Sequence, residues 1–219
     1  MEGDLDPSHF SFLHMPAPSV PSDANPKAPA DARRLRYIRN DPRPRIEVMP
    51  HDAGFITGAA RSTENEGAYW RILQYLVPAH GTGPSTLPGE TYFGFTTVPI
   101  TDHACWMYVY AWNPDRDIDE TDREKYRKGH GIIAEVGPDY VPLLNKANEF
   151  EIDRTVQRDV SFTGINGFAD QDIMVQQSQG LIADRTQENL AASDIAIVRF
   201  RRRVLTGAKA LANGEEPSE

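Results

Sequence analysis

The chain of 219 residues contains a single cysteine, Cys105. One thiol cannot form a disulfide within the chain. It also cannot supply the several cysteines of a Cys-rich zinc site or of an iron–sulfur cluster. Cys105 stands inside the apolar run 104–110, so we expect a thiol packed in the core.

The sequence also lacks a long apolar run and an excess of positive charge. No apolar segment approaches the roughly 18 residues that span a bilayer, and the acidic residues 1–6 do not resemble a secretory or transit signal. A net charge of −9 argues against nucleic-acid binding, which needs a basic surface. We therefore expect a cytoplasmic protein without membrane or nucleic-acid partners. The basic cluster at 199–203 is expected to be the solvated face of a helix, with a lipid or nucleic-acid patch as the minor alternative.

The pattern of apolar residues predicts antiparallel strands in the first half of the chain. Alternating, β-branched and aromatic residues separated by turn residues are typical of such strands. Both faces of the last strand are apolar, so we expect both to be covered. The predicted strands are 45–49, 55–60, 68–77, 92–100 and 104–112, with a polar turn at 101–103.

Helical patterns dominate the second half. The longest covers 186–211, with Ser193 as a candidate N-cap. Together with the strands it predicts an α+β fold, in which a long C-terminal helix lies against a curved antiparallel sheet that encloses a pocket. Further expectations are a helix in the first residues, a proline-rich loop at 15–29, a strand or helix at 33–39, a helix or loop at 119–128, a helix at 171–179 and a disordered tail at 214–219.

Two histidines near the N-terminus, His9 and His14, follow the carboxylate Asp6. Imidazole and carboxylate groups are ligands that suit iron(II). Five positions along a regular helix turn the two side chains roughly 140° apart. We therefore predict a π-bulge or a helix end between them, which would let both reach one metal. The alternative is a chance pair, with Asp6 acting only as a helix N-cap.

A second set of motifs favours the metal site over a chance pair of histidines. With the histidine segment, it resembles the catalytic domain of Rieske non-heme iron oxygenases of the phthalate 4,5-dioxygenase-like branch. The resemblance covers essentially the whole chain and implies a helix-grip, START-like fold. The matching pieces are Asp6-x-x-His9-x4-His14, Trp112 to Arg116, Gln171-Asp172, Val175-Gln176, Ser178-Gln179-Gly180, Asp184-Arg185-Thr186 and Ser193-Asp194.

The resemblance implies roles for individual residues. His9, His14 and Asp172 would hold a mononuclear Fe(II), with Asp170 and Asp184 as alternative carboxylates. Asp6 would link the iron site to a Rieske cluster on the neighbouring subunit by accepting hydrogen bonds from ligand histidines. The Asn that commonly stands three residues before this carboxylate in the family is replaced by Gly3.

The substrate pocket is expected to be mostly apolar with few polar anchors. Arg71 shares a predicted strand face with apolar residues, so it is expected either to clamp a substrate carboxylate or to form a buried ion pair. Each apolar candidate could line this pocket or simply pack in the core, and the sequence does not decide between the two. These candidates are Phe10, Phe12, Phe162, Ile165 and Phe168.

The resemblance also implies what the chain lacks. A Rieske [2Fe-2S] cluster needs paired Cys-x-His and Cys-x-x-His elements, and one cysteine cannot supply them. We expect residues 1–213 to form a partial iron domain without its Rieske domain. The simplest account is a truncated reading frame, and we expect this chain to be inactive alone. Missing strands would leave an open sheet edge.

The full-length enzyme would take electrons from a reductase through the cluster, activate O2 and hydroxylate or O-demethylate an aromatic, carboxylated substrate. The resemblance also implies that the full-length enzyme forms a homotrimer or hexamer. Two alternatives remain open at this point. One is a non-catalytic small-molecule binding module of the same fold, and the other is an inactive gene fragment.

Overall fold

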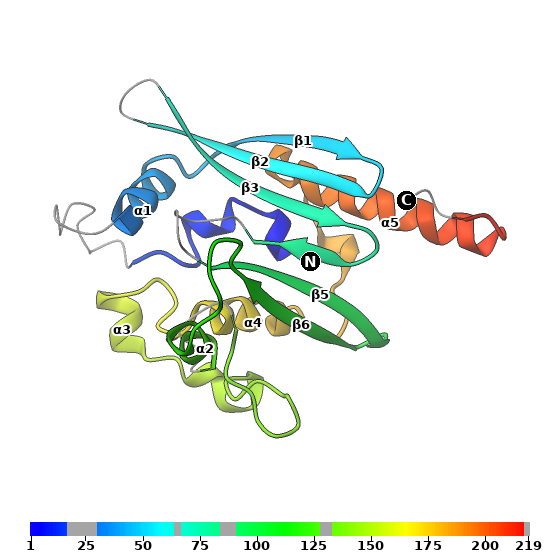
Figure 1. Cartoon of the computed structure of the whole chain (residues 1–219). Coiled ribbons are helices and arrows are strands. Elements are labelled where there is room, and N and C mark those ends of the chain that lie inside the picture. Colours follow the sequence, from blue (N-terminus) through cyan, green and yellow to red (C-terminus); the bar gives the residue numbers. More distant parts are fainter. Residues whose placement is uncertain (17–29, 64–66, 84–90, 128–132, 217–219) are drawn as a thin grey trace. The chain divides into compact units, whose positions relative to one another are not determined.

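The computed structural model describes residues 1–16, 30–63, 67–83, 91–127 and 133–216. The chain forms two compact units (Figure 1). The first unit comprises Met1–Ser8, Asp41–Asn113 and Asn189–Glu219, and the second comprises His9–Asn40 and Pro114–Glu188. No described helix is both long and apolar enough to cross a membrane.

A six-stranded antiparallel sheet forms the centre of the first unit, and its strands follow in sequence order. This confirms the expected α+β class with a curved antiparallel sheet. The predicted strands are all present, and the turn at 101–103 joins the last two. Sequence reasoning missed β4, because three residues are too few to show a pattern. The strands are β1 Arg45–His51, β2 Gly54–Ser62, β3 Ala68–Leu76, β4 His80–Thr82, β5 Tyr92–Thr101 and β6 Ala104–Trp112.

The long C-terminal helix α5, Ile195–Ala212, packs on β1 and closes the core of this unit. The core gathers Leu5, Phe55, Tyr75, Ala196 and Ile197, of which Ala196 has no exposed surface. Burial of these apolar side chains is the main stabilising contribution to this packing.

The helix α5 begins later than predicted, and Ser193 is not its N-cap. The N-cap is Asp194, whose Oδ2 accepts a hydrogen bond from the Ala191 amide at 2.6 Å. That bond closes the 3₁₀ helix η5, Ala192–Asp194, in place of a continuous helix. Another 3₁₀ helix, η4 (Arg185–Gln187), precedes it in the second unit.

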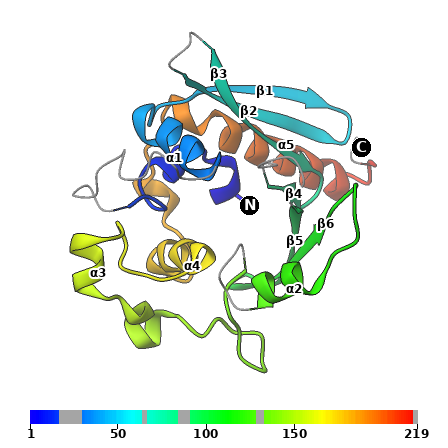
Figure 2. The same cartoon turned by 60° about the vertical axis from the view of Figure 1, so that its left-hand side comes forward.

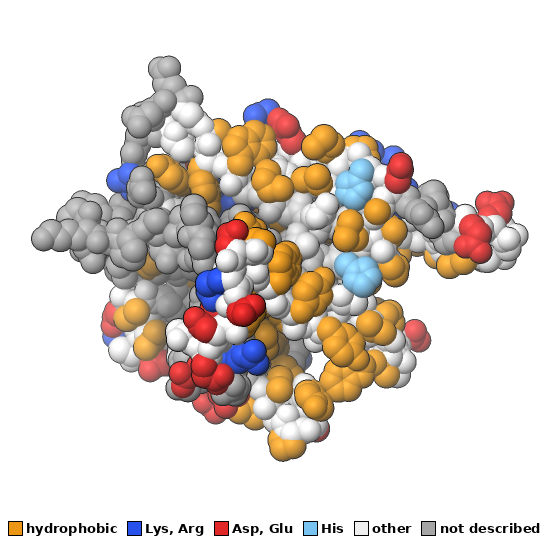
Figure 3. All heavy atoms as spheres, in the orientation of Figure 1, with side chains coloured by type: hydrophobic (Ala, Val, Ile, Leu, Met, Phe, Trp, Pro, Cys, Tyr) orange, Lys and Arg blue, Asp and Glu red, His pale blue; other side chains and the backbone are white. Residues whose placement is uncertain are grey.

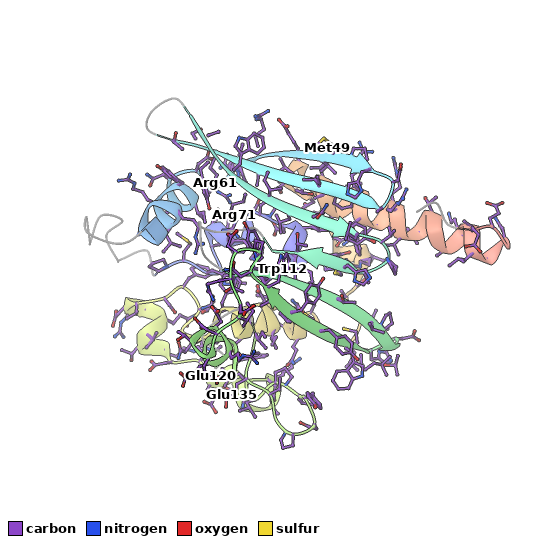
Figure 4. All side chains as sticks on the ribbon, in the orientation of Figure 1. Met49, Arg61, Arg71, Trp112, Glu120 and Glu135 are labelled. Carbon is purple, nitrogen blue, oxygen red and sulfur yellow. The ribbon has the colours of Figure 1, made fainter. Side chains whose placement is uncertain are left out.

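A buried arginine ties the N-terminal segment to the sheet. The Arg61 guanidinium donates to the Pro7 carbonyl oxygen at 2.7 Å and to the Asp41 carbonyl oxygen at 3.1 Å. Burial lowers the pKa of Arg61. The pairing of Ala59 with Arg71 places Arg61 and Arg71 on one face of β2 and β3. Figure 4 shows these two labelled side chains on the neighbouring strands.

The hairpin of β5 and β6 leaves a broad apolar surface exposed. Figure 3 shows hydrophobic side chains gathered over it. Cys105 is exposed, so the prediction of a core thiol is wrong. The expectation that both faces of the last strand are covered is also wrong, because Trp106 and Tyr108 on one face of β6 and Cys105 and Met107 on the other are all exposed. The exposed residues are Val98, Ile100, Trp106, Met107, Tyr108, Tyr110 and Trp112.

The second unit consists of helices and irregular segments, and Figure 2 shows α4 nearly end-on. The segment 33–39 is helical, within α1. The segment expected to be a helix or a loop near 119–128 forms the helix α2, and the predicted helix near 171–179 is confirmed as α4. Its helices are α1 Ala30–Asn40, α2 Glu120–Arg127, α3 Arg154–Asp159 and α4 Phe168–Ser178, with the 3₁₀ helices η2 His9–Ser11, η3 Lys146–Glu151 and η4.

The N-terminal end of the chain differs from its expected structure. The first residues form the short 3₁₀ helices η1, Gly3–Leu5, and η2 rather than one regular helix. Most of the expected loop at 15–29 lies outside the described residues, as does the end of the expected tail, 217–219. Residues 214–216 are exposed.

Candidate metal centre

Backbone hydrogen bonds join the histidine segment to the segment that leads into α4. The Phe162 amide donates to the Met15 carbonyl oxygen at 3.0 Å, and Pro16 forms an isolated β-bridge with Ser161. These contacts lie directly after His14 and shortly before α4 begins. They bring together residues that are far apart in the sequence.

The two histidines lie on either side of a helix end. The 3₁₀ helix η2 begins at His9 and ends at Ser11, and the Leu13 amide donates to the His9 carbonyl oxygen at 2.8 Å. The rings of His9 and His14 meet edge to face, with centroids 5.1 Å apart and an interplanar angle of 72°. The helix end predicted between them is confirmed, and the resulting turn places both rings on one side.

The first turns of α4 present three side chains to this pair. Phe168, Gln171 and Asp172 are spaced by three and four residues, so they share one face of the helix. The helix follows Gly167, whose φ of +113° favours glycine. A Cβ at this position would lie 2.2 Å from the Asp170 Oδ2 atom. The start of α4 therefore depends on glycine here.

His9, His14 and Asp172 offer three ligand atoms within 4.8 Å of one another. The Asp172 Oδ1 atom lies 3.8 Å from His9 Nε2 and 3.2 Å from His14 Nε2. Two ligand atoms each roughly 2.1 Å from one ion lie roughly 3 Å apart in adjacent positions and about 4.2 Å apart in opposite ones. The two separations fall in this range.

The Nε2 atom of His14 is buried and has no hydrogen-bond partner among the described residues. Buried polar atoms in native proteins nearly always have a partner. A cation held between this nitrogen and the facing Asp172 oxygen would satisfy both. Two imidazoles and one carboxylate are also the donor set of non-heme iron(II) sites. The residues present therefore fit a mononuclear iron.

Aromatic rings and an amide surround His14. Phe168 stacks on its ring with centroids 3.7 Å apart and an angle of 15°, and Phe10 contacts both histidines. The Gln171 Oε1 atom lies 2.8 Å from His14 Nδ1. Sequence reasoning missed this role of Gln171. The available signal was its position beside Asp172 and three residues after Phe168.

The alternative carboxylates are not part of this group. Asp170 is buried, and burial raises its pKa, with a further rise from the nearby charge of Glu135. Asp184 is exposed and caps η4, where a hydrogen bond from the Thr186 hydroxyl lowers its pKa. The three-residue group contains neither of them.

The remaining pocket candidates of the second unit lie in different environments. Phe12 and Phe162 are exposed, and Ile165 is buried. The backbone carbonyl of Ile165 accepts a hydrogen bond from the side-chain amide nitrogen of Gln171 at 3.1 Å. Ile165 is thus linked to His14 through the Gln171 side chain, by its backbone carbonyl and not by its own side chain.

Two further candidates belong to the first unit. The Asp6 Oδ1 atom accepts a hydrogen bond from the Ser8 amide at 2.8 Å. Arg71 is buried on β3, on the face that also buries Leu73 and Tyr75 (Figure 4). The strand face predicted for Arg71 is therefore confirmed.

Comparison with known proteins gives three similar oxygenase subunits. The phthalate 4,5-dioxygenase oxygenase subunit of Pseudomonas putida is 35% identical over 98% of this chain and 49% of that protein. The 3-chlorobenzoate-3,4-dioxygenase oxygenase subunit of Comamonas testosteroni is 29% identical over 99% of this chain and 52% of that protein. The 5,5'-dehydrodivanillate O-demethylase oxygenase subunit of a Sphingobium species is 23% identical over 99% of this chain and 42% of that protein.

The chain thus spans about half the length of these relatives. The profile of one protein family, described as LigXa C-terminal domain like, matches residues 1–218. This match covers nearly the whole chain and agrees with the three relatives. The chain belongs to the LigXa C-terminal domain-like family.

Proposed function

We propose that this chain is the iron-binding catalytic part of a Rieske-type oxygenase that acts on aromatic compounds. His9, His14 and Asp172 are the proposed ligands of one Fe(II). The single observation that carries the proposal is the buried His14 Nε2 atom, which lacks a hydrogen-bond partner among the described residues and faces Asp172 at 3.2 Å.

The side chains of the site have separate roles in this proposal. His9, His14 and Asp172 would hold the iron, and the iron would supply the activation of O2 next to a substrate when bound. Asp172 is partly exposed, whereas His14 is almost fully buried. The ligand set is thus accessible from the Asp172 side. Phe168 and Phe10 hold the imidazole rings and limit the access of water to them.

The names of the relatives support the proposed reaction class, since two of them are named as dioxygenase subunits and one as a demethylase subunit. Hydroxylation consumes O2, two electrons and two protons. Both oxygen atoms enter the ring in a dihydroxylation. In an O-demethylation one oxygen atom is inserted into a methyl C–H bond, and the resulting hemiacetal breaks down to formaldehyde and the phenol, which keeps the ether oxygen. The other oxygen atom leaves as water. The electrons would come from a reductase through a Rieske cluster in a homo-oligomer, with Asp6 as their entry point.

The substrate proposed here is a carboxylated aromatic compound. Phthalate, chlorobenzoate and dehydrodivanillate, after which the relatives are named, all carry carboxylates. Arg71 is the proposed anchor, because a guanidinium binds a carboxylate through two parallel hydrogen bonds. Its burial among apolar side chains of β3 strengthens such a contact by excluding water.

The test is anaerobic reconstitution of the chain with Fe(II), followed by removal of loose metal and iron analysis. We expect about one iron per wild-type chain and loss of this iron in His9→Ala, His14→Ala and Asp172→Ala. His103→Ala is the matched control, because His103 lies in the exposed turn between β5 and β6. A wild-type chain that retains no iron, or variants that retain as much as wild type, would support a non-catalytic binding module instead.

A further inference from the structure

The orientation of the Gln171 side-chain amide is set by the backbone. Its Nε2 atom lies 3.1 Å from the Ile165 carbonyl oxygen, and a carbonyl oxygen only accepts hydrogen bonds. The NH2 group of Gln171 must therefore face Ile165. Its Oε1 atom then faces His14 Nδ1 at 2.8 Å.

This orientation determines which nitrogen of His14 carries the proton. An amide oxygen only accepts, so His14 Nδ1 must be the N–H that donates to Gln171. In the neutral ring the Nε2 atom then carries a lone pair, which is the form that binds a metal. The Nε2 lone pair points into the group formed with His9 and Asp172.

We infer that Gln171 is a positioning residue that selects the metal-binding tautomer of His14 and fixes the direction of its ring. This inference rests on the proposed iron site. The hydrogen bonds run from the Ile165 carbonyl through the Gln171 amide to the imidazole. Phe168, one turn earlier on α4, stacks on the same ring and restrains it from the face.

Gln171 therefore acts on the metal without touching it. A histidine ligand almost always donates its second N–H to another group, and loss of that group typically lowers metal affinity or activity roughly 10- to 100-fold. Here the side-chain amide of Gln171 provides the acceptor. Because Gln171 directly precedes Asp172, the same turn of α4 carries one proposed ligand and positions another, His14. We expect Gln171→Met, which keeps the length of the side chain but lacks the acceptor, to weaken metal binding by this factor.

The first experiment reads the tautomer in the metal-free chain from long-range ¹H–¹⁵N spectra of the histidine rings. We expect His14 in wild type to be protonated at Nδ1, and Gln171→Met to show a mixture or the Nε2–H form. Gln171→Glu retains an acceptor oxygen, so it is expected to restore the Nδ1–H form. Predominance of the Nε2–H form in wild type would overturn the inference, even if Gln171→Met did not fold.

The second experiment measures Fe(II) and Co(II) affinity by competition with a chelator under anaerobic conditions. Gln176→Ala is the matched control, because Gln176 is an exposed glutamine on the same helix. We expect its affinity to equal that of wild type. If wild type binds metal and Gln171→Met binds it within twofold as tightly, only the positioning role fails. If wild type binds no metal, the proposed function fails as well.

Discussion

The Nε2 atom of His14 lies 3.2 Å from the Oδ1 atom of Asp172, with no hydrogen-bond partner of its own among the described residues. In the tautomer that Gln171 favours, both atoms present lone pairs, so the metal-free arrangement is electrostatically unfavourable. A cation between them removes this cost. Metal binding is therefore expected to stabilise the second unit.

The first prediction concerns this stabilisation. A ligand at 100 times its Kd stabilises the folded state by about 2.7 kcal/mol, which corresponds to roughly 5–10 °C in Tm for a chain of this size. We expect Fe(II) or Co(II) to raise the Tm by this amount and a chelator to reverse the effect. Asp172→Asn is expected to abolish the rise. Anaerobic thermal scans measure it.

Asp102→Asn is the control, since Asp102 lies in the exposed turn between β5 and β6. It removes one negative charge, as Asp172→Asn does, without touching the metal site. An equal loss of metal stabilisation in both variants would show that the effect is general charge attraction rather than coordination.

The second prediction concerns Gly167, which precedes α4. Gly167→Ala adds a Cβ that meets the buried Asp170 carboxylate and also adopts a strained φ, so we expect Asp170 and the start of α4 to shift. Gly180→Ala is the matched control, because its φ is +90° but the space around it is open. Backbone strain of about 1–2 kcal/mol is expected in both variants.

Only Gly167→Ala is expected to weaken metal binding, because only there does the shift move Asp172. Denaturant unfolding measures the shared loss of stability, and chelator competition measures the separate loss of affinity. Equal metal affinity in the two alanine variants would contradict the argument that Gly167 sets the position of α4.

The third prediction concerns the pH dependence of stability. Burial raises the pKa of Asp170, so the folded chain holds this proton more tightly than the unfolded chain. The stability that Asp170 contributes is therefore fully present below the unfolded pKa, about 3.9. It is lost as the pH rises through the higher folded-state value. As the pH rises, the free energy of unfolding of Asp170→Asn is expected to fall less than that of wild type. Urea unfolding without metal measures both.

Asp184 provides the opposite case. Hydrogen bonds from Thr186 lower its pKa, so its contribution is present above the unfolded pKa and is lost as the pH falls through the folded-state value. Asp184→Asn is expected to lose less stability than wild type on acidification. Parallel pH curves for wild type and both variants would contradict these assignments.

The sequence predicted the strands and the three members of the proposed metal site, but not the contacts that depend on tertiary structure. His9, His14 and Asp172 could be chosen from residue type and motif. The Gln171–His14 hydrogen bond could not, because it depends on how residues 161–168 fold against Met15. Similarly, the alternation around Cys105 predicts a strand, whereas its burial depends on what covers the strand.

Helix boundaries show the same limit. Residues 186–194 have a helical pattern, but Asp184 and Asp194 accept nearby backbone amides and form 3₁₀ turns instead. Short polar side chains compete with the helix in this way. Sequence patterns thus predicted that a helix exists near the C-terminus, and local side-chain hydrogen bonds decided where α5 begins.

The fourth prediction concerns Arg71 and rests on the proposed substrate class. Hydrogen bonds to a charged group contribute roughly 1.5–3 kcal/mol, so Arg71→Met is expected to weaken binding of phthalate to the metal-loaded chain roughly 10- to 100-fold. Arg71→Lys keeps the charge but loses the planar fork, and is expected to be intermediate. Calorimetric titration measures both. If Arg71→Met weakens the binding of phthalate and of its uncharged diamide by the same factor, Arg71 has a structural role and does not bind the carboxylate.

The last prediction concerns the edge strand β6. Among the described strands it pairs only with β5, and Trp106 and Tyr108 on it are 40% and 57% exposed. An exposed apolar edge strand is a template for pairing with another chain. We expect this chain to self-associate as its concentration rises, and Tyr108→Lys or Trp106→Lys to reduce the association. Leu181→Lys, at an exposed leucine outside the sheet, is the control. Sedimentation analysis decides, and association that all three lysine variants weaken equally would show that β6 is not the contact.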